Sequence, residues 1–177
     1  QNQSSDATDN TSQSSSATPT TSTFNIPLND SADYLYDQSI VRNYYIILDP
    51  DSLAYLDNDP GEEDYVGGSI VLDGDTIGPV GIRYNGEGCV GNSGSSKNCP
   101  KLSMKVDLTW SSSNFRIHGK KRLNFKAMLN DETQMRERLG FWMFNKMGVP
   151  APRAVHAKIT VNNTFAGLFT LIEDVDE

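Results

Sequence analysis

The sequence has few of the cysteine and histidine residues that build zinc centres. It contains two cysteines, Cys89 and Cys99, and two histidines, His118 and His156, which are far from the cysteines and from each other. This set does not supply the four ligands of a structural zinc site. The acidic segment 57–64 lacks the ligand spacing of an EF-hand and is interpreted as a solvated loop. We therefore expect no metal site, and we expect Cys89 and Cys99 to form a disulfide across a Gly/Ser/Asn-rich loop.

The sequence also lacks long hydrophobic runs. No stretch approaches the roughly 18 apolar residues of a membrane span. Hydrophobic residues make up only 37% of the chain, which is low for a globular protein, so part of the chain is not expected to pack. Residues 1–23 contain no large apolar residue. We predict that residues 1–38 form a disordered Ser/Thr-rich tail, serving either as an O-glycosylated stalk or as a linker without a role of its own.

Basic residues are nearly absent from the first part of the chain. Residues 1–79 contain 14 acidic residues against one basic residue, Arg42, a net charge of −13. Residues 80–177 contain 14 basic and 9 acidic residues, a net charge of +5. This asymmetry favours an anionic ligand or intramolecular steering, and two differently solvated faces would explain it as well.

Four N-glycosylation sequons begin at Asn2, Asn10, Asn29 and Asn162. Each one is a weak signal by itself. Together with two cysteines that can pair, they favour an oxidising compartment. We therefore expect a secreted or cell-surface glycoprotein.

The folded part begins with strand signals near residue 39. Residues 40–49 are rich in β-branched and aromatic side chains and predict a strand. A short helix follows, with Asp49 or Asp51 as its N-cap. Residues 65–86 alternate between apolar and polar positions and predict two strands joined by a turn at 73–75.

The second half contains further alternating segments. Residues 101–110 predict a strand, and a short strand is expected around 122–125. Residues 154–161 alternate strictly, and the Asn162-Asn163 pair predicts a tight turn into a return strand, because Asn tolerates positive φ. The inward face of the strand at 101–110 comprises Leu102, Met104, Val106 and Leu108.

The strongest helix signal follows residue 130. Asp131 and Gln134 have the spacing of a capping box, with Asp in place of Ser or Thr. Gly148 is expected to end the helix in the left-handed conformation. The apolar stripe of this helix comprises Met135, Leu139, Trp142, Met143 and Met147. We predict that the stripe packs on one face of a mostly antiparallel sheet, so that residues 39–177 form an α+β domain with one main covering helix.

Four segments of the chain resemble the CotH family of spore-coat and cell-surface proteins with an atypical protein-kinase fold. They are VGIRYNG (80–86), PKLSMKVDL (100–108), the run from LNFKAMLNDE to MGVPAPRA (123–154) and VNNTFAGLFTLIEDVDE (161–177). The resemblance covers about residues 40–177. One departure is Lys-Leu-Ser at 101–103, where the family has Lys-Lys-Ser.

The resemblance implies a fold like a kinase amino-terminal lobe, truncated before the second lobe that would hold the metal ligands. It also implies ATP and Mg as cofactors and a protein substrate for Ser/Thr phosphorylation, with this fragment inactive alone. The alternative is a non-catalytic cell-surface or spore-coat module for adhesion or structure. The expected partners are a nucleotide and a protein substrate or surface partner, without nucleic acid or a membrane span.

Under this resemblance, Lys101 or Lys105 would contact nucleotide phosphate from the strand at 101–110. Glu137 in the helix would hold that lysine, and Arg136 would contact a phosphate or a carboxylate. The plainer interpretation is that these four side chains are solvent-facing charges of a strand and a helix.

Two further candidate groups are weaker. Arg83 and the Gly-rich loop that follows it would cradle phosphate through backbone N–H groups. Glu173 falls where a hinge to a second lobe would begin. A disulfide-closed turn and a polar strand end explain these features equally well.

Overall fold

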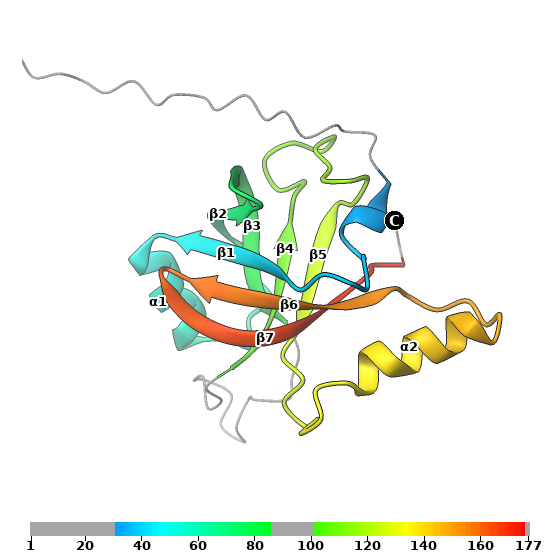
Figure 1. Cartoon of the computed structure of the whole chain (residues 1–177). Coiled ribbons are helices and arrows are strands. Elements are labelled where there is room, and N and C mark those ends of the chain that lie inside the picture. The colour runs from blue at the N-terminus through cyan, green and yellow to red at the C-terminus, as the bar shows by residue number, and fades with distance from the viewer. Residues whose placement is uncertain (1–30, 86–100, 176–177) are drawn as a thin grey trace, which may run out of the picture.

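Seven strands dominate the computed structural model, which describes residues 31–85 and 101–175 (Figure 1). The strands form a closed barrel in the order β1-β2-β3-β4-β5-β7-β6. Their bounds are β1 (Arg42–Leu48), β2 (Val66–Leu72), β3 (Asp75–Asn85), β4 (Ser103–Asp107), β5 (Arg122–Lys126), β6 (Ala154–Val161) and β7 (Thr164–Ile172). The described residues also form a short 3₁₀-helix, η1 (Ala32–Tyr34), and two α-helices, α1 (Pro50–Asn58) and α2 (Arg136–Lys146).

One parallel pairing closes the barrel. β1 pairs with β6 in parallel, with Tyr44 opposite Ile159. Every other neighbouring pair in the barrel is antiparallel. Closure leaves the sheet without an edge strand, so every strand is hydrogen-bonded on both sides.

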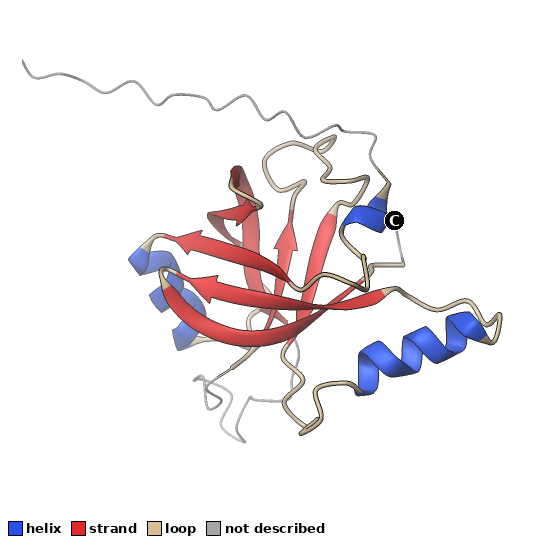
Figure 2. Ribbon diagram, in the orientation of Figure 1, coloured by secondary structure: helices blue, strands red, loops and turns tan. Residues whose placement is uncertain are grey.

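The barrel corrects the expected fold class. The prediction of an α+β domain, with a mostly antiparallel sheet under one covering helix as in a kinase amino-terminal lobe, is wrong. The described residues are mostly β, and their two α-helices are short. A closed barrel fills its own interior with side chains, so no bare apolar sheet face is left for a helix. Figure 2 shows α2 beside the barrel, not across it.

The predicted helix stripe is accordingly not buried. Its five members, from Met135 to Met147, are 40–72% exposed. No residue of α2 is buried. The main strand neighbour of α2 is β6. The presence of the helix and its end before Gly148, which has φ of 74°, were predicted correctly, but its start was not, because α2 begins at Arg136 and not at Asp131.

The local predictions for the first half of the barrel are confirmed. β1 occupies the predicted strand, and Asp49 caps α1 by accepting a hydrogen bond from the Asp51 amide at 2.9 Å. β2 and β3 form the predicted hairpin. Its turn places Asp73 and Gly74 at positive φ, which the short polar side chain of Asp and the missing Cβ of Gly tolerate.

The local predictions for the second half are also confirmed. β4 alternates as expected, with Met104 and Val106 inside the barrel. β6 and β7 are joined at Asn162 and Asn163, which both have positive φ. The Asn162 side chain also accepts from the amide of Leu48 at 2.8 Å and donates to its carbonyl at 2.9 Å. This contact ties the hairpin turn to the end of β1.

One hydrophobic core fills the barrel and continues beneath the N-terminal segment. Tyr44 and Phe125 meet edge to face inside the barrel, with ring centroids 5.0 Å apart. Leu35 and Tyr36, which follow η1, belong to the same core although the sequence placed them in the tail. Residues 1–30, and both Cys89 and Cys99, lie outside the described residues.

Candidate functional site

Four cations lie on the outer side of β3, β4 and β5. Because side chains alternate along these strands, the core residues point inward and these cations point outward: Lys105, Arg122 and Lys126 are partly exposed, whereas Arg83 is buried. Arg83 is directly opposite Lys105 in the strand register. We call these four residues the outer cationic face.

Carboxylates accompany this face. Glu63 pairs with Arg83 at 3.1 Å. Asp174, which follows β7, lies 3.6 Å from the Lys105 ammonium and 3.7 Å from the Arg122 guanidinium. An anionic ligand on this part of the face would therefore compete with carboxylates of the protein itself.

A hollow of about 310 Å³ lies where the outer cationic face meets the start of α2. We call it the β5–α2 hollow. Its polar lining brings together strand and helix residues that are distant in the sequence. The lining residues are Ser103, Lys126, Met128, Leu129, Asn130, Asp131, Arg136 and Glu137.

Glu137 is the electrostatically unusual member of this hollow. Burial raises the pKa of its carboxyl group, and the nearby Lys126 ammonium partly opposes that rise. Its Oε2 atom is buried, and no hydrogen-bond partner is present among the described residues. A buried carboxylate oxygen without a partner is costly, so Glu137 is poised to accept a hydrogen bond from a cation that moves closer.

Asp131 organises the start of α2. It does not form the predicted capping box, because α2 begins at Arg136 with Met135 as a cap residue that makes no side-chain cap bond. Asp131 instead accepts from the Thr133 hydroxyl at 2.6 Å and from the Arg136 amide at 2.7 Å. The Thr133 hydroxyl, followed by the Arg136 amide, lowers the pKa of Asp131. Asp131 therefore lies against the positive end of the helix dipole.

Lys101 lies elsewhere. It lines a separate hollow of about 300 Å³, which is formed by residues of α1, β4 and the β6–β7 hairpin. Its ammonium group donates to the carbonyl of Leu168 and sits 4.5 Å from the ring centroid of Phe169. Burial lowers the pKa of Lys101. The structure therefore separates Lys101 from Glu137, while Lys105 lies on the outer cationic face.

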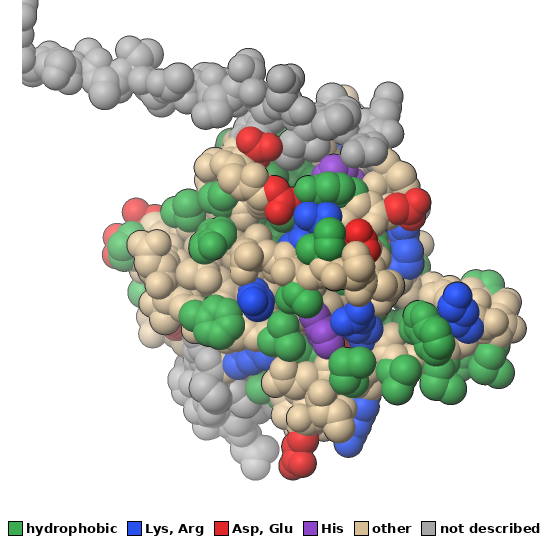
Figure 3. All heavy atoms as spheres, viewed as in Figure 1, with side chains coloured by type: hydrophobic (Ala, Val, Ile, Leu, Met, Phe, Trp, Pro, Cys, Tyr) green, Lys and Arg blue, Asp and Glu red, His purple; other side chains and the backbone are tan. Residues whose placement is uncertain are grey.

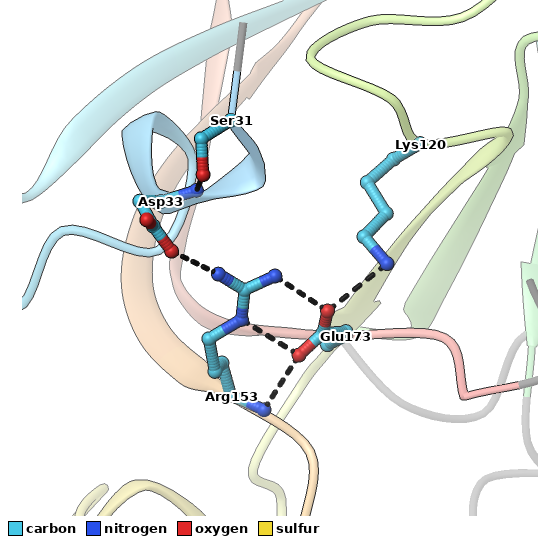
Figure 4. Close-up of polar contacts among 5 residues, drawn as sticks. All are labelled: Ser31, Asp33, Lys120, Arg153 and Glu173. Carbon is cyan, nitrogen blue, oxygen red and sulfur yellow. Dashed lines mark hydrogen bonds and ion pairs between the residues drawn. The ribbon is translucent and has the colours of Figure 1, made fainter.

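Glu173 belongs to an ion-pair network at another corner of the molecule (Figure 4). Arg153 donates to its two carboxylate oxygens at 2.6 and 2.8 Å, and Lys120 lies 2.9 Å away. Arg153 also reaches Asp33 at 2.5 Å. The hydrogen bonds from Arg153 dominate in lowering the pKa of Glu173 to about 2. This network joins the start of β6, the end of β7 and the N-terminal segment.

The predicted site residues are thus distributed over four places. Arg136 and Glu137 share the β5–α2 hollow, Arg83 and Lys105 are neighbours on the outer cationic face, and Lys101 and Glu173 lie apart from both. Sequence reasoning missed Lys126, the lysine that shares the hollow with Glu137. Its signal was available in the alternation of residues 122–126, which predicts an outward side chain at 126.

Neither a cluster of metal ligands nor a membrane-spanning helix is present among the described residues. No group of three or more His, Cys, Asp or Glu side chains is arranged to hold a metal ion there. Neither α-helix that the structure describes is long and apolar enough to cross a membrane.

Comparison with known proteins identifies the family. A search of curated proteins gave no match. The family model described as CotH kinase protein matches residues 82–177, from the end of β3 to the end of the chain as given. This stretch includes β4, β5, α2 and the β5–α2 hollow. Because the match covers more than half of the 177 residues, the chain belongs to the CotH kinase protein family.

Proposed function

We propose that this chain binds the phosphates of ATP at the β5–α2 hollow, as part of a CotH protein kinase that phosphorylates protein substrates. The family description supports phosphoryl transfer. The observation that carries the location is that Lys126 and the partly buried Glu137 line the same hollow. Phosphoryl transfer depends on cations positioned over the phosphates, and this hollow supplies them.

The residues of the hollow fit a phosphate group. Lys126 and Arg136 both line it and carry positive charge. The Glu137 carboxylate beside Lys126 would orient that ammonium toward a phosphate while satisfying its own buried oxygen. Lys105 points outward from the neighbouring strand β4, where Asp174 lies 3.6 Å from its ammonium group. ATP would supply the transferable phosphoryl group, and these residues would bind and orient it.

The β5–α2 hollow does not provide a set of ligands for the magnesium ion that kinases use. Asp131 and Glu137 are the acidic residues lining the hollow. Asp131 already accepts from Thr133 and Arg136, and no cluster of three candidate ligands exists among the described residues. We therefore assign no residue of the described chain to magnesium, and the proposal concerns the phosphates alone.

A non-catalytic module on a cell surface or spore coat is the second candidate. Two observations favour it: carboxylates accompany cations of the outer face, and α2 exposes a large apolar surface. Secretion, a Cys89–Cys99 disulfide and glycosylation fit both candidates and remain proposals. Saturable nucleotide binding distinguishes the two.

Calorimetric titration with ATP tests the proposal. We expect saturable binding to the chain, weakened about tenfold or more in Lys126→Met, because a charge-assisted contact from the half-buried Lys126 is lost. Glu137→Gln should weaken binding less, since it removes the group that orients Lys126 but not the cation itself. Lys158→Met is the matched control, because Lys158 is exposed on β6 and should bind ATP as the unmodified chain does.

Two outcomes would contradict the assignment. If the chain binds no ATP up to millimolar concentration, the surface-module candidate is favoured. If ATP binds but Lys105→Met abolishes binding while Lys126→Met does not, the phosphates contact the outer cationic face and not the β5–α2 hollow. Circular dichroism of each variant checks that the barrel is folded.

A further inference from the structure

Helix α2 carries an apolar surface that no other part of residues 31–85 and 101–175 covers. None of its 11 residues is buried, and it exposes Leu139, Trp142, Met143 and Phe144, with Met147 next to its end. Figure 3 shows hydrophobic side chains gathered along this helix with basic side chains among them. Contiguous apolar surface of this kind marks an interaction site.

The cations on α2 are placed regularly around an aromatic residue. Arg138, Trp142 and Lys146 are spaced four residues apart, so they form one row along the helix. With a rise of about 1.5 Å per residue, the two cations are separated by about 12 Å along the axis. Trp142 lies between them, and the Lys146 ammonium is 5.9 Å from its ring centroid.

Two hollows flank Trp142. One, of about 330 Å³, is lined by Gln38, Met135, Arg138, Leu139 and Trp142. The other, of about 360 Å³, is lined by Tyr36, Gln38, Trp142, Asn145, Lys146, Arg153 and Ala154. Both lie between α2 and the segment that precedes β1, and Gln38 and Trp142 belong to both. We call the two hollows together the α2 groove.

The α2 groove has positive charge that carboxylates do not neutralise. Arg138 hydrogen-bonds the side chain and the carbonyl of Gln38 and contacts a ring nitrogen of His156, none of which is a carboxylate. In residues 31–85 and 101–175, neither Arg138 nor Lys146 forms an ion pair, and no Asp or Glu lines the groove. Arg153 is different, because Glu173 and Asp33 balance its charge.

We propose that the α2 groove binds an acidic amphipathic helix of a partner protein. An apolar side chain of the partner helix packs on Trp142. Two carboxylates of the partner, about two helical turns apart, reach Arg138 and Lys146. An aromatic anchor between matched charges provides both affinity and register. The site is separate from the β5–α2 hollow, so the proposal does not depend on ATP binding.

Charge and shape favour an acidic partner helix over two other occupants, a second copy of this chain and an anionic membrane. A second copy of the chain meeting α2 to α2 would bring cationic rows together, and like charges at an interface are costly. An anionic membrane would match the charge, but a flat lipid surface does not fill a hollow on each side of Trp142. A helix with protruding side chains fills both.

A fluorescein-labelled synthetic peptide tests the proposal by anisotropy titration. The probe is a helical peptide of about 18 residues with a central Phe, apolar neighbours on the same face, and Glu four residues before and after the Phe. A matched peptide has Lys in place of those two Glu. We expect the acidic peptide to bind about tenfold more tightly than the Lys peptide. Its binding should weaken as salt rises, because the charges are at the surface.

Substitutions locate the binding site. Trp142→Ala should weaken binding of the acidic peptide about tenfold, and Lys146→Glu should weaken it about fivefold. Phe165→Ala and Lys158→Glu are the matched controls, since both residues are exposed on the β6–β7 hairpin, and they should stay within about twofold. All four side chains are exposed, so folding of the barrel is not at risk.

Each alternative has its own result. Equal binding of the acidic and the Lys peptides would overturn the charge argument, and absence of binding by the acidic peptide would overturn the proposal. Cosedimentation with anionic vesicles that is lost in Trp142→Ala, without peptide binding, would assign the groove to a membrane. Sedimentation equilibrium showing a dimer that Trp142→Ala dissociates, again without peptide binding, would assign it to a second copy.

Discussion

In the barrel, Ile70, Val106 and Phe125 have no exposed surface, whereas on α2 Leu139 and Trp142 are nearly half exposed. Both regions are rich in large apolar side chains. The barrel strands close on one another, so their inward side chains pack together and every strand has two neighbours. α2 has one main strand neighbour, β6, and its apolar stripe finds no sheet face to cover.

The difference shows that an amphipathic pattern predicts a helix but not what the helix packs against. A periodic stripe of apolar residues is consistent with burial inside the same domain or with burial against a partner. In this chain the barrel already uses the sheet faces that the stripe would need. The stripe is therefore available for recognition, while the barrel provides the stability.

The largest expected effect contrasts one side chain from each region. Phe125→Ala removes a fully buried ring from the barrel and should lower the free energy of unfolding by about 4 kcal/mol. Trp142→Ala should lower it by less than about 0.5 kcal/mol, because the ring is half exposed. Urea unfolding followed by circular dichroism measures both. A loss of similar size in the two variants would show that α2 is part of the same cooperative unit as the barrel.

The second effect tests the ion network that ties the N-terminal segment to the barrel. Glu173→Gln should lower the free energy of unfolding by about 2 kcal/mol at neutral pH, because Arg153 and Lys120 lose their charged partner.

The pH dependence of this effect has a definite sign. The pKa of Glu173 is lowered from 4.5 to about 2 in the folded chain. Its stabilising contribution is therefore present above pH 4.5 and is lost as the pH falls toward 2. The stability difference between the unmodified chain and Glu173→Gln should shrink over that range. A difference that is constant from pH 7 to pH 2 would mean that packing, and not charge, is responsible. Glu132→Gln is the control, because Glu132 is exposed.

Most strands and both helices could be predicted from the sequence, but the barrel could not. Alternation places β4 and β6 correctly, because a half-buried strand shows a period of two wherever it pairs, and the β-branched and aromatic composition of residues 40–49 places β1. Alternation does not show which strand a given strand pairs with, so the parallel pairing of β1 with β6 could not be predicted from the sequence. That single pairing converts an open sheet into a closed barrel and removes the face that α2 was expected to cover.

The candidate site could be predicted only in part, because the sequence shows which residues a helix carries but not which strand residues lie beside them. Arg136 and Glu137 were identified on the helix, and they line the β5–α2 hollow. Lys101 and Lys105 were named as candidates for the nucleotide contact and Lys126 was not, because the register between β4, β5 and α2 depends on tertiary packing. Lys126 meets Glu137 only once β5 is placed beside the start of α2.

The third prediction concerns the attachment of α2 to the barrel. Arg138 donates to the Gln38 carbonyl at 2.7 Å and to the Gln38 side chain at 3.0 Å, and contacts the His156 ring at 3.1 Å. Arg138→Ala should destabilise this attachment by about 1 kcal/mol. Amide hydrogen exchange in α2 should become about fivefold faster, while the urea midpoint of the barrel changes little. Lys146→Ala is the control on the same helix, and equal acceleration there would contradict the anchoring role of Arg138.

The smallest effect separates the two regions most cleanly. Gly140 lies inside α2, and a Cβ added there meets no atom within 4 Å. Gly140→Ala should stabilise the helix by about 0.5–1 kcal/mol, since Ala loses less backbone entropy on ordering. Gly148→Ala should have the opposite effect and destabilise the end of the helix, because φ of 74° at Gly148 is strained for any residue with a side chain.

The size of this gain matters less than where it is observed. If α2 opens independently of the barrel, Gly140→Ala slows hydrogen exchange in α2 alone and leaves the urea midpoint unchanged. If the midpoint rises with it, α2 unfolds together with the barrel. The exposed stripe would then belong to a rigid surface and not to an arm that can reorient on its partner. In both cases Gly140→Ala should raise the affinity of the proposed partner for α2, because a helix that is already ordered loses less entropy on binding.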